Sequence, residues 1–543
     1  MGTNDGKPAD LVLFGDVVTM NDAAPRARAV AVRDGRIAAV GNDSAVFPLI
    51  GPATITVDLH RACILPGFIE AHGHPLNSAV LLGEPVVDIR PVTIADAGEV
   101  VDAVRRAVDE HPDGAVLNGW DPLLQKGLPE PTREWLNSIA PDTSLVILHN
   151  TGHVAYFNDV AARDSGLTKD TPDPEGGSFG RDESGELDGS AFEAPAVMAV
   201  AATILAGAST RLPELLAAEC ARMNAAGITT ASEMAFDPRF RSALTAFARS
   251  GALTTRLRLY EMSNPERATD VSPGVGNDLL RQVGIKIWSD GSPWVGNAAT
   301  SFPYLDTDVT RSLGLAGTRG EANYTTDEIL EISKPYFEKG WQISCHANGD
   351  AAVTLVLDAW ERMLADSPRE DHRLRLEHVG AMTPDQFRRA TELGVTCSIF
   401  VDHLYYWGDV LVDDLFGPER GARWAAAGSA IKAGQRISFH NDGPVTTTNP
   451  LRTLGEAVTR RTRSGRVLAP EERISVPDAL RAETINSAWH LRSEDAIGAI
   501  APGMHADLVV LSANPLLVDP DDIADLEVLA TILEGRTVFG KLE

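Results

Sequence analysis

The chain has 543 residues, of which 44% are hydrophobic and 23% charged, and its formal net charge is −28. This length favours a large barrel-type domain with a smaller partner over a single small domain. The strong negative charge makes nucleic acid and anionic membranes poor partners, so we expect neither. The sequence also lacks an uncharged apolar run of about 18 residues, the signature of a transmembrane helix.

Both ends of the chain show β-strand patterns. Apolar runs with strand-like alternation and an Asp-Gly hairpin signal predict strands at Leu11–Met20, Ala29–Val40, Ala53–Leu59, Ala506–Leu511 and Val528–Phe539. We therefore expect a small β-sandwich domain built from both termini, residues 1–62 and 491–543.

The middle of the chain, residues 63–490, alternates strands with amphipathic helices. Eight apolar runs end in polar residues and predict strands at Cys63–Ala71, Gly227–Glu233, Thr254–Tyr260, Gly284–Asp290, Trp341–His346, Arg373–His378, Gly394–Ile399 and Gln435–Asp442. Helices are predicted between them at Thr326–Lys339, Ala351–Asp366 and Pro384–Leu393. This rhythm predicts an α/β fold, a (β/α)8 barrel of the TIM type, with catalytic residues at the C-terminal ends of its strands.

A long segment interrupts the barrel after its first strand. A βα loop needs only a few residues, so the stretch of about 77–225 is too long to be one. We expect an inserted subdomain over the barrel mouth that shapes the substrate pocket.

The four cysteines are Cys63, Cys220, Cys345 and Cys397, which are scattered and form no C-x-x-C pair. They are interpreted as reduced core residues. The polar N-terminus has no apolar signal-peptide stretch. Together these features predict a cytoplasmic protein.

The segment Gly-Phe-Ile-Glu-Ala-His-Gly-His-Pro ends the first barrel strand with His72 and His74. Side chains two residues apart on a strand point to one face, so both imidazoles can reach a shared metal. A chance pair is the alternative, because a lone H-x-H is a weak signal. Its place at a strand end favours a metal site.

Three further ligand candidates end later strands. His346, His378 and Asp442 each close a predicted strand at the end where barrel enzymes place their chemistry. Taken singly, each histidine could be a core or surface residue, and Asp442 a helix cap or turn residue. Their shared position favours ligands instead.

Lys286 lies inside the apolar run Gly-Ile-Lys-Ile-Trp-Ser-Asp-Gly. A charged ammonium there is costly unless it is paired. One interpretation is an ion pair with Asp290, four residues later on the same face. The other is carboxylation of the amine to a carbamate, an N6-carboxylysine that could bridge two metals.

The chain resembles the amidohydrolase superfamily, in particular the YtcJ-like amidohydrolase family, which is related to N-substituted formamide deformylases. The resemblance covers nearly the whole chain. It rests on ordered segments: Leu-Pro-Gly-Phe-Ile-Glu-Ala-His-Gly-His, Gly-His-Val-Ala-Tyr-Phe-Asn around His153, Ile-Lys-Ile-Trp-Ser-Asp-Gly-Ser, His-Ala-Asn-Gly-Asp, Leu-Glu-His, Asn-Asp-Gly-Pro-Val and Pro-Gly-Met-His-Ala-Asp-Leu-Val-Val-Leu.

The resemblance implies a divalent metal, with Zn²⁺ as the expected ion and one or two ions per chain. It places the metal site on His72, His74, Lys286, His346, His378 and Asp442. It also implies hydrolysis of an amide or formamide-type C–N bond by metal-activated hydroxide, with Asp442 as the catalytic proton shuttle. A small amide-like molecule is the expected substrate, and the family allows a homodimer.

Five residues are predicted to bind the substrate, namely His153, Trp120, Asp290, His403 and His440. For His153 the alternative is an ordinary loop histidine, and for His403 and its neighbouring aromatics it is core packing. His440 stands where the family more often has a small residue, so it could instead support the metal ligands.

The sequence leaves two other functions to compare with amide hydrolysis. A deaminase or cyclic-amide hydrolase could use the same ligands, but the sequence Ala-Asn-Gly-Asp after His346 lacks the glutamate such deaminases place there. A barrel kept only for binding or assembly would be expected to have lost ligands, and all six are present.

Overall fold

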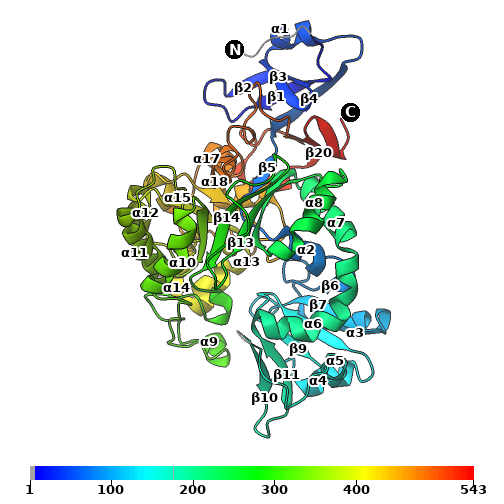
Figure 1. Cartoon of the computed structure of the whole chain (residues 1–543), viewed down its shortest axis with the longest axis vertical. Helices are drawn as coiled ribbons and strands as arrows, with labels where there is room; N and C mark the ends of the chain where they lie inside the picture. The colour runs from blue at the N-terminus through cyan, green and yellow to red at the C-terminus, as the bar shows by residue number, and fades with distance from the viewer. Residues whose placement is uncertain (1–6, 175–176, 543) are drawn as a thin grey trace. The chain divides into compact units, whose positions relative to one another are not determined.

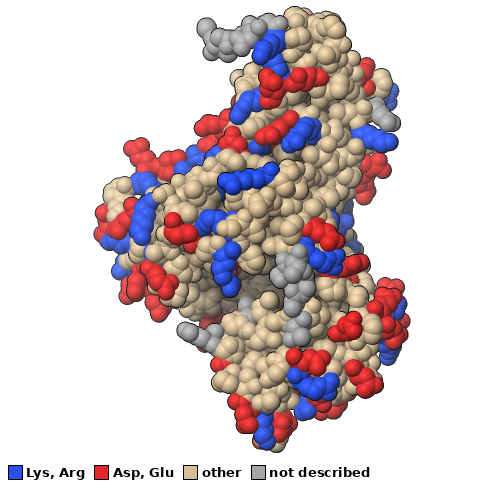
Figure 2. Space-filling view, turned by 45° about the vertical axis from the view of Figure 1, so that its right-hand side comes forward, with Lys and Arg blue, Asp and Glu red and all other residues tan. Residues whose placement is uncertain are grey.

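The computed structural model describes residues 7–174 and 177–542, which form two compact units. Unit 1 runs up to Pro75 and includes Cys220–Gly443 and the chain from Thr448 onward; unit 2 comprises Leu76–Glu219 and Pro444–Thr447. The domain limits predicted from the sequence stay predictions. On the face drawn in Figure 2, acidic and basic side chains are intermingled.

Unit 1 contains an eight-stranded parallel sheet in the order β18-β17-β16-β15-β14-β13-β12-β5. Strands that are neighbours in this sheet are also consecutive barrel strands along the chain, as a (β/α)8 barrel requires. The predicted fold class is therefore confirmed. The strands are β5 Phe68–Glu70, β12 Ile228–Phe236, β13 Arg256–Met262, β14 Leu280–Trp288, β15 Gln342–Ala347, β16 Arg375–His378, β17 Thr396–Ile399 and β18 Ser438–Phe439.

The first predicted strand, Cys63–Ala71, divides at Gly67. Its first part belongs to β4 (Ile55–Pro66) of the terminal sheet, and only β5 enters the barrel. A Cβ atom on Gly67 would lie 2.2 Å from the Thr229 hydroxyl oxygen. Only glycine therefore lets the chain pass from one sheet to the other so close to β12.

In the described residues, β5 and β18, the first and last barrel strands, do not pair with each other. The segments next to them are connected by side-chain and backbone hydrogen bonds instead. The backbone N–H of Asn441 donates to both carboxylate oxygens of Glu70, at 3.1 Å each. The His74 amide donates to the Gly443 carbonyl at 3.0 Å. These bonds place the H-x-H segment beside the loop that carries Asp442.

Helices alternate with the barrel strands, and the three predicted from the sequence occur as α10, α11 and α12. The helices of unit 1 are α1 Asp43–Val46, α8 Arg241–Arg249, α9 Asp308–Ser312, α10 Thr326–Glu338, α11 Asp350–Asp366, α12 Pro384–Glu392, α13 Asp402–Val410, α14 Gly417–Arg420, α15 Ala427–Lys432, α16 Pro450–Thr459, α17 Val476–Ala482 and α18 Ile485–His490.

The strands of the two chain ends form one seven-stranded sheet in the order β21-β20-β19-β4-β1-β2-β3. Figure 1 shows blue N-terminal strands and the red β20 in this region. Strands from both chain ends thus pair with one another in one small β domain, as the sequence predicts. Its strands are β1 Leu11–Val18, β2 Arg26–Arg33, β3 Arg36–Gly41, β4, β19 Leu508–Leu511, β20 Val528–Leu533 and β21 Arg536–Gly540.

Unit 2 has its own six-stranded sheet in the order β10-β11-β9-β8-β7-β6. These strands are β6 Val86–Asp88, β7 Ala115–Trp120, β8 Leu145–His149, β9 Val154–Phe157, β10 Ser178–Arg181 and β11 Leu187–Phe192. Its helices are α3 Ala97–Glu110, α4 Arg133–Ile139, α5 Asp159–Asp164 and α6 Glu193–Thr210, while α2 Pro75–Leu81 and α7 Leu212–Ala225 span the unit limits.

All four cysteines are buried, and none of them forms a disulfide, as the sequence predicts. Among the described residues, we found no helix that combines the length and apolar character needed to cross a membrane.

Candidate metal centre

The six predicted ligands gather at the carboxyl ends of the barrel strands in unit 1. Two of them follow β5, one each lies on β14, β15 and β16, and one follows β18: His72, His74, Lys286, His346, His378 and Asp442. The fractional exposure of Lys286 and His72 is 0%, and that of Asp442 is 8%. The site is therefore a shielded cluster of nitrogen and oxygen atoms.

Asp442 lies at the centre of this cluster. Its Oδ1 atom is 3.3 Å from Nε2 of His74 and 3.5 Å from Nε2 of His72. Its Oδ2 atom is 3.9 Å from Nδ1 of His378. Burial alone would raise the pKa of Asp442, but His72 and His74 hold it below its ordinary value. Asp442 is therefore an ionised acceptor at neutral pH.

The remaining ligand candidates adjoin the same histidines. Nζ of Lys286 lies 3.1 Å from Nε2 of His72. The ring centroids of His72 and His378 are 4.6 Å apart, and those of His346 and His378 are 4.4 Å apart. The structure thus brings all six residues together, while their roles as ligands stay predictions.

This cluster fits a divalent cation. His74 Nδ1 and Asp442 Oδ1 are buried and make no hydrogen bond. In each of two groups, His72 with His74 and Asp442, and His72 with His378 and His440, the candidate donor atoms lie within 4.8 Å of one another. Buried polar atoms without a partner are costly, and a cation would satisfy them. Imidazole and carboxylate donors suit Zn²⁺ and similar metals.

The sequence did not predict that a buried carboxylate, Glu377, contacts one of the histidine ligand candidates. Nδ1 of His72 lies 2.7 Å from Oε2 of Glu377. Glu377 is also paired with Arg375 at 2.9 Å and accepts the hydroxyl of Ser344 at 2.7 Å. Burial favours protonation of Glu377, yet Arg375 and Lys286 hold its pKa below the ordinary value. A glutamate inside the short strand β16 was the available signal.

Lys286 does not pair with Asp290, so that interpretation was wrong. The Asp290 carboxylate instead accepts three backbone amide hydrogens, from Ala299 at 3.0 Å, Asn348 at 2.9 Å and Gly349 at 2.8 Å. Burial lowers the pKa of Lys286 to about 8. At pH 7 about a tenth of its population is then the neutral amine, the form that carboxylation requires; the carbamate stays a prediction.

Of the residues predicted to bind substrate, three adjoin the metal cluster. Asp290 Oδ1 lies 3.6 Å from Nε2 of His346. The ring of Phe400 is 4.1 Å from that of His403 and 5.0 Å from that of His440. Because its carboxylate accepts three backbone N–H groups, Asp290 orders the surrounding loops. Its contact with substrate stays a prediction.

The other two lie in unit 2. Trp120 is 1% exposed and packs against Trp135, with ring centroids 5.6 Å apart. The His153 side chain is 40% exposed, and its Nδ1 lies 2.8 Å from Oε2 of Glu193. Their predicted roles in substrate binding stay predictions.

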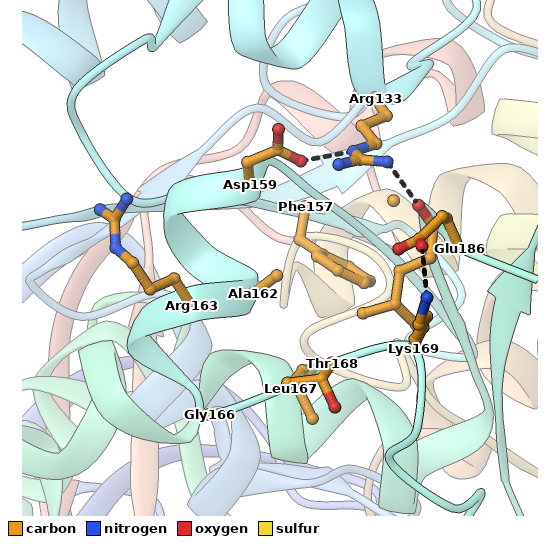
Figure 3. A pocket seen from close by; sticks show the side chains of 12 residues that line it. Arg133, Phe157, Asp159, Ala162, Arg163, Gly166, Leu167, Thr168, Lys169 and Glu186 are labelled. Atoms are coloured by element: carbon orange, nitrogen blue, oxygen red, sulfur yellow. Dashed lines mark hydrogen bonds and ion pairs between the residues drawn. The ribbon is translucent and has the colours of Figure 1, made fainter.

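A cavity of about 430 Å³ lies wholly within unit 2 (Figure 3). Its three cationic side chains each have an acidic partner: Arg133 pairs with Asp159, Lys169 with Glu186 and Arg163 with Asp164. It contains none of the predicted ligands. We therefore place the chemistry at the barrel cluster.

Comparisons with known proteins identify the family. The model of the family described as "Amidohydrolase family" matches residues 56–539. Protein LONG AFTER FAR-RED 3 of Arabidopsis thaliana is 27% identical, with 97% of this chain and 91% of that protein covered. N-substituted formamide deformylase of Arthrobacter pascens is 26% identical over 97% of both chains.

The putative amidohydrolase YtcJ of Bacillus subtilis (strain 168) is 24% identical, with 97% of this chain and 98% of that protein covered. Among solved structures, an uncharacterised metal-dependent hydrolase from Pyrococcus horikoshii OT3 has the same fold, with a TM-score of 0.75 and 22% identity over 94% of this chain and 99% of that one. The family match spans most of the sequence, and the chain belongs to the amidohydrolase family.

Proposed function

We propose that this protein is a metal-dependent hydrolase that cleaves the C–N bond of a small amide or formamide-type substrate. The observation that carries the proposal is the cluster of six ligand-type side chains, Asp442 and five others. Some of its buried polar atoms make no hydrogen bond. The name of the Arthrobacter relative, a formamide deformylase, supports the substrate class.

The metal would be held by His72, His74, His346, His378, Asp442 and Lys286. A divalent cation bound there supplies Lewis acidity, which lowers the pKa of water to about 7 and polarises a carbonyl group. Zinc agrees best with the imidazole-rich donor set.

Asp442 would move the proton. Its ionised carboxylate, held at the strand ends with a φ of 53°, is the acceptor for a proton from the attacking water. The same carboxyl group then donates that proton to the departing nitrogen. A matched pair of proton transfers lets one residue serve as base and then as acid.

His403 would donate a hydrogen bond to the substrate. The indole N–H of Trp424 donates to Nδ1 of His403 at 3.2 Å. Because an indole nitrogen can only donate, the proton of the neutral His403 ring must be on Nε2. Burial lowers the pKa of His403 to about 3, so the ring stays neutral, and the nearby Asp442 and His346 also affect this value. A neutral N–H so close to the cluster suits a substrate carbonyl oxygen.

The test is hydrolysis by the full-length chain reconstituted with Zn²⁺. The panel contains N-substituted formamides, simple N-acyl amines and cyclic amides, with formate, carboxylate, free amine and ammonia measured separately. We expect release of an amine with formate or a carboxylate. A metal-loaded protein that opens only cyclic amides, or that releases only ammonia from amino-substituted rings, would contradict the proposed class of open-chain amide or formamide substrates.

A further inference from the structure

Two of the four predicted histidine ligands direct one ring nitrogen to an oxygen acceptor at hydrogen-bond distance. Nδ1 of His74 lies 3.6 Å from Oε1 of Glu233, which is too far for a hydrogen bond. Nδ1 of His72 lies 2.7 Å from Oε2 of Glu377, and Nε2 of His346 lies 3.2 Å from the carbonyl oxygen of Gly291. Such oxygen partners fix which ring nitrogen carries the proton and leave the other available to a metal.

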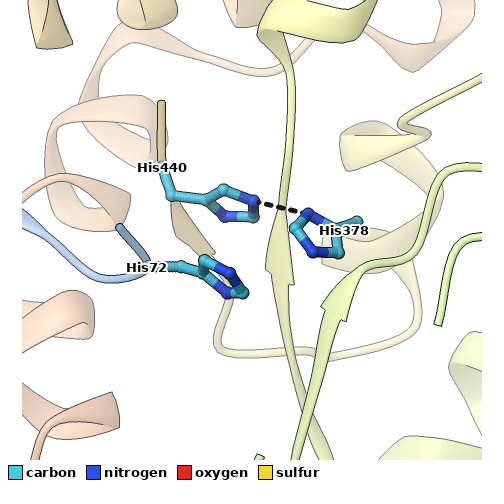
Figure 4. A group of neighbouring side chains, drawn as sticks. All are labelled: His72, His378 and His440. Atoms are coloured by element: carbon cyan, nitrogen blue, oxygen red, sulfur yellow. Dashed lines mark hydrogen bonds between the residues drawn. The ribbon is translucent and has the colours of Figure 1, made fainter. Parts of the chain in front are cut away.

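His378 has a different partner, another histidine. Its Nδ1 lies 3.1 Å from Nε2 of His440, as Figure 4 shows. Nδ1 of His440 lies 2.8 Å from the hydroxyl of Ser398 on β17. The rings of His440 and His72 are stacked, with centroids 4.7 Å apart. Both nitrogens of His440 are therefore engaged within the protein.

The distances allow one consistent placement of protons. Two imidazole nitrogens 3.1 Å apart can share only one hydrogen atom. If His378 donates its Nδ1–H, its Nε2 has a free lone pair for a metal. His440 then accepts at Nε2 and donates Nδ1–H to Ser398. The opposite placement would put the His378 proton on Nε2 and block that nitrogen.

We infer that Ser398 and His440 form a relay that holds His378 in the orientation and tautomer needed to bind the metal. His440 is then a positioning residue, which replaces the substrate-binding role predicted from the sequence. The inference rests on the proposed function only in requiring a metal at this centre, and it needs no particular substrate.

The barrel offers a matched control. Two residues before Ser398 and His440 on the same strands, Thr396 and Ser438 flank His490, with its ring nitrogens 2.9 Å from each hydroxyl. His490 is 0% exposed, and its ring nitrogens lie against Thr396, Ser438 and the carbonyl oxygen of Arg436, none of which is a predicted ligand. Replacing it tests the cost of removing a buried, doubly bonded histidine from this barrel.

The experiment compares metal-free full-length variants by Zn²⁺ competition titration against a chromogenic chelator, and by the visible spectrum with Co²⁺. His440→Leu removes the acceptor, whereas His440→Gln keeps an amide oxygen for His378. We expect His440→Leu to weaken Zn²⁺ binding by about 10–100-fold. His440→Gln should recover most of that loss, and His490→Leu should lower the thermal midpoint while keeping wild-type affinity.

Each outcome decides the inference. Wild-type affinity in His440→Leu would overturn it. So would a Co²⁺ spectrum showing one nitrogen ligand fewer without rescue by His440→Gln, because His440 would then be a ligand itself. If His440→Leu does not fold, Ser398→Ala takes its place, with a smaller loss of affinity expected and no loss contradicting the relay. Absence of metal binding by the wild-type chain would instead refute the proposed function.

Discussion

At the scale of single residues, the centre depends on side chains whose environment forces their chemical state. Asp442 is ionised because histidines outweigh the effect of its burial, and Glu377 because Arg375 and Lys286 do the same. Each carboxylate is then available as a hydrogen-bond acceptor. Of these two acids, only Asp442 has an oxygen that is buried without a hydrogen bond, and this distinguishes the proposed proton shuttle from the structural acid.

Asp442→Asn tests this distinction. The amide keeps the size and one oxygen donor but cannot accept the water's proton, so we expect kcat to fall by about 10²–10⁴-fold with a much smaller change in KM. Steady-state kinetics on the best substrate of the panel provide the measurement. Asp306→Asn, at an exposed aspartate of the same unit, is the control. Equal losses in both variants, or none in Asp442→Asn, would count against the role.

The sequence predicted the six ligand candidates because each closes a strand, and strand ends of a parallel barrel converge. It did not predict Glu377, Ser398 or the true surroundings of Lys286. Glu377 and His378 are adjacent, and alternation would send them to opposite faces. The φ of 70° at His378 turns the chain at the strand end, which the sequence pattern does not encode.

At the scale of elements, the passage from β4 to β5 determines where the H-x-H segment lies. The sequence pattern could not place this break, because residues 63–71 form one apolar run. The close packing of Gly67 against Thr229 fixes it. β5 is only three residues long, so a displacement at Gly67 reaches His72 directly.

Gly67→Ala is expected to lower the free energy of unfolding by about 1–3 kcal/mol, because the new methyl group overlaps Thr229. It should also weaken Zn²⁺ binding through displacement of His72. Gly455→Ala is the control: the nearest atom to its Cβ would be 3.5 Å away, an ordinary contact in α16. Denaturant unfolding and chelator competition give both quantities, and wild-type stability of Gly67→Ala would refute the steric account.

Helices α13 and α16 bring together two buried acids, Asp402 and Glu456. Glu456 is 3% and Asp402 is 1% exposed, and their two carboxyl groups form a side-chain hydrogen bond. Asp402 in turn accepts the side-chain amide of Asn441 at 2.8 Å and the hydroxyl of Thr453 at 2.9 Å. Burial, reinforced by Asp402, raises the pKa of Glu456 well above 4.5. Glu456 is therefore protonated in the folded protein.

This protonation predicts a pH dependence. Between pH 4.5 and the raised pKa, the folded chain keeps a proton that the unfolded chain has lost. Stability must therefore fall as pH rises, by up to about 1.4 kcal/mol per pH unit for this one group. Glu456→Gln should flatten the dependence of the unfolding midpoint on pH, whereas the exposed Glu419→Gln should not. An unchanged slope in Glu456→Gln would show that Glu456 is ionised in the fold.

At the scale of the whole molecule, the alternation of apolar runs and amphipathic helices was sufficient to predict the barrel. Buried parallel strands need nearly continuous apolar runs and cannot be mistaken for half-exposed ones. The strand order of the terminal sheet was not predictable, because strand pairing between distant segments leaves no local signal. The position of β19 next to β4 illustrates this: these strands are separated by more than 400 residues in the sequence.

The central claim is that this chain binds a divalent metal through the barrel cluster. Elemental analysis of the purified full-length protein, after reconstitution with Zn²⁺ and removal of free ions, tests it most directly. We predict one or two ions per folded chain, and loss of most of this metal in a folded His72→Asn/His74→Asn variant. A folded wild-type chain without stoichiometric metal, or a double variant with the full wild-type content, would contradict the account.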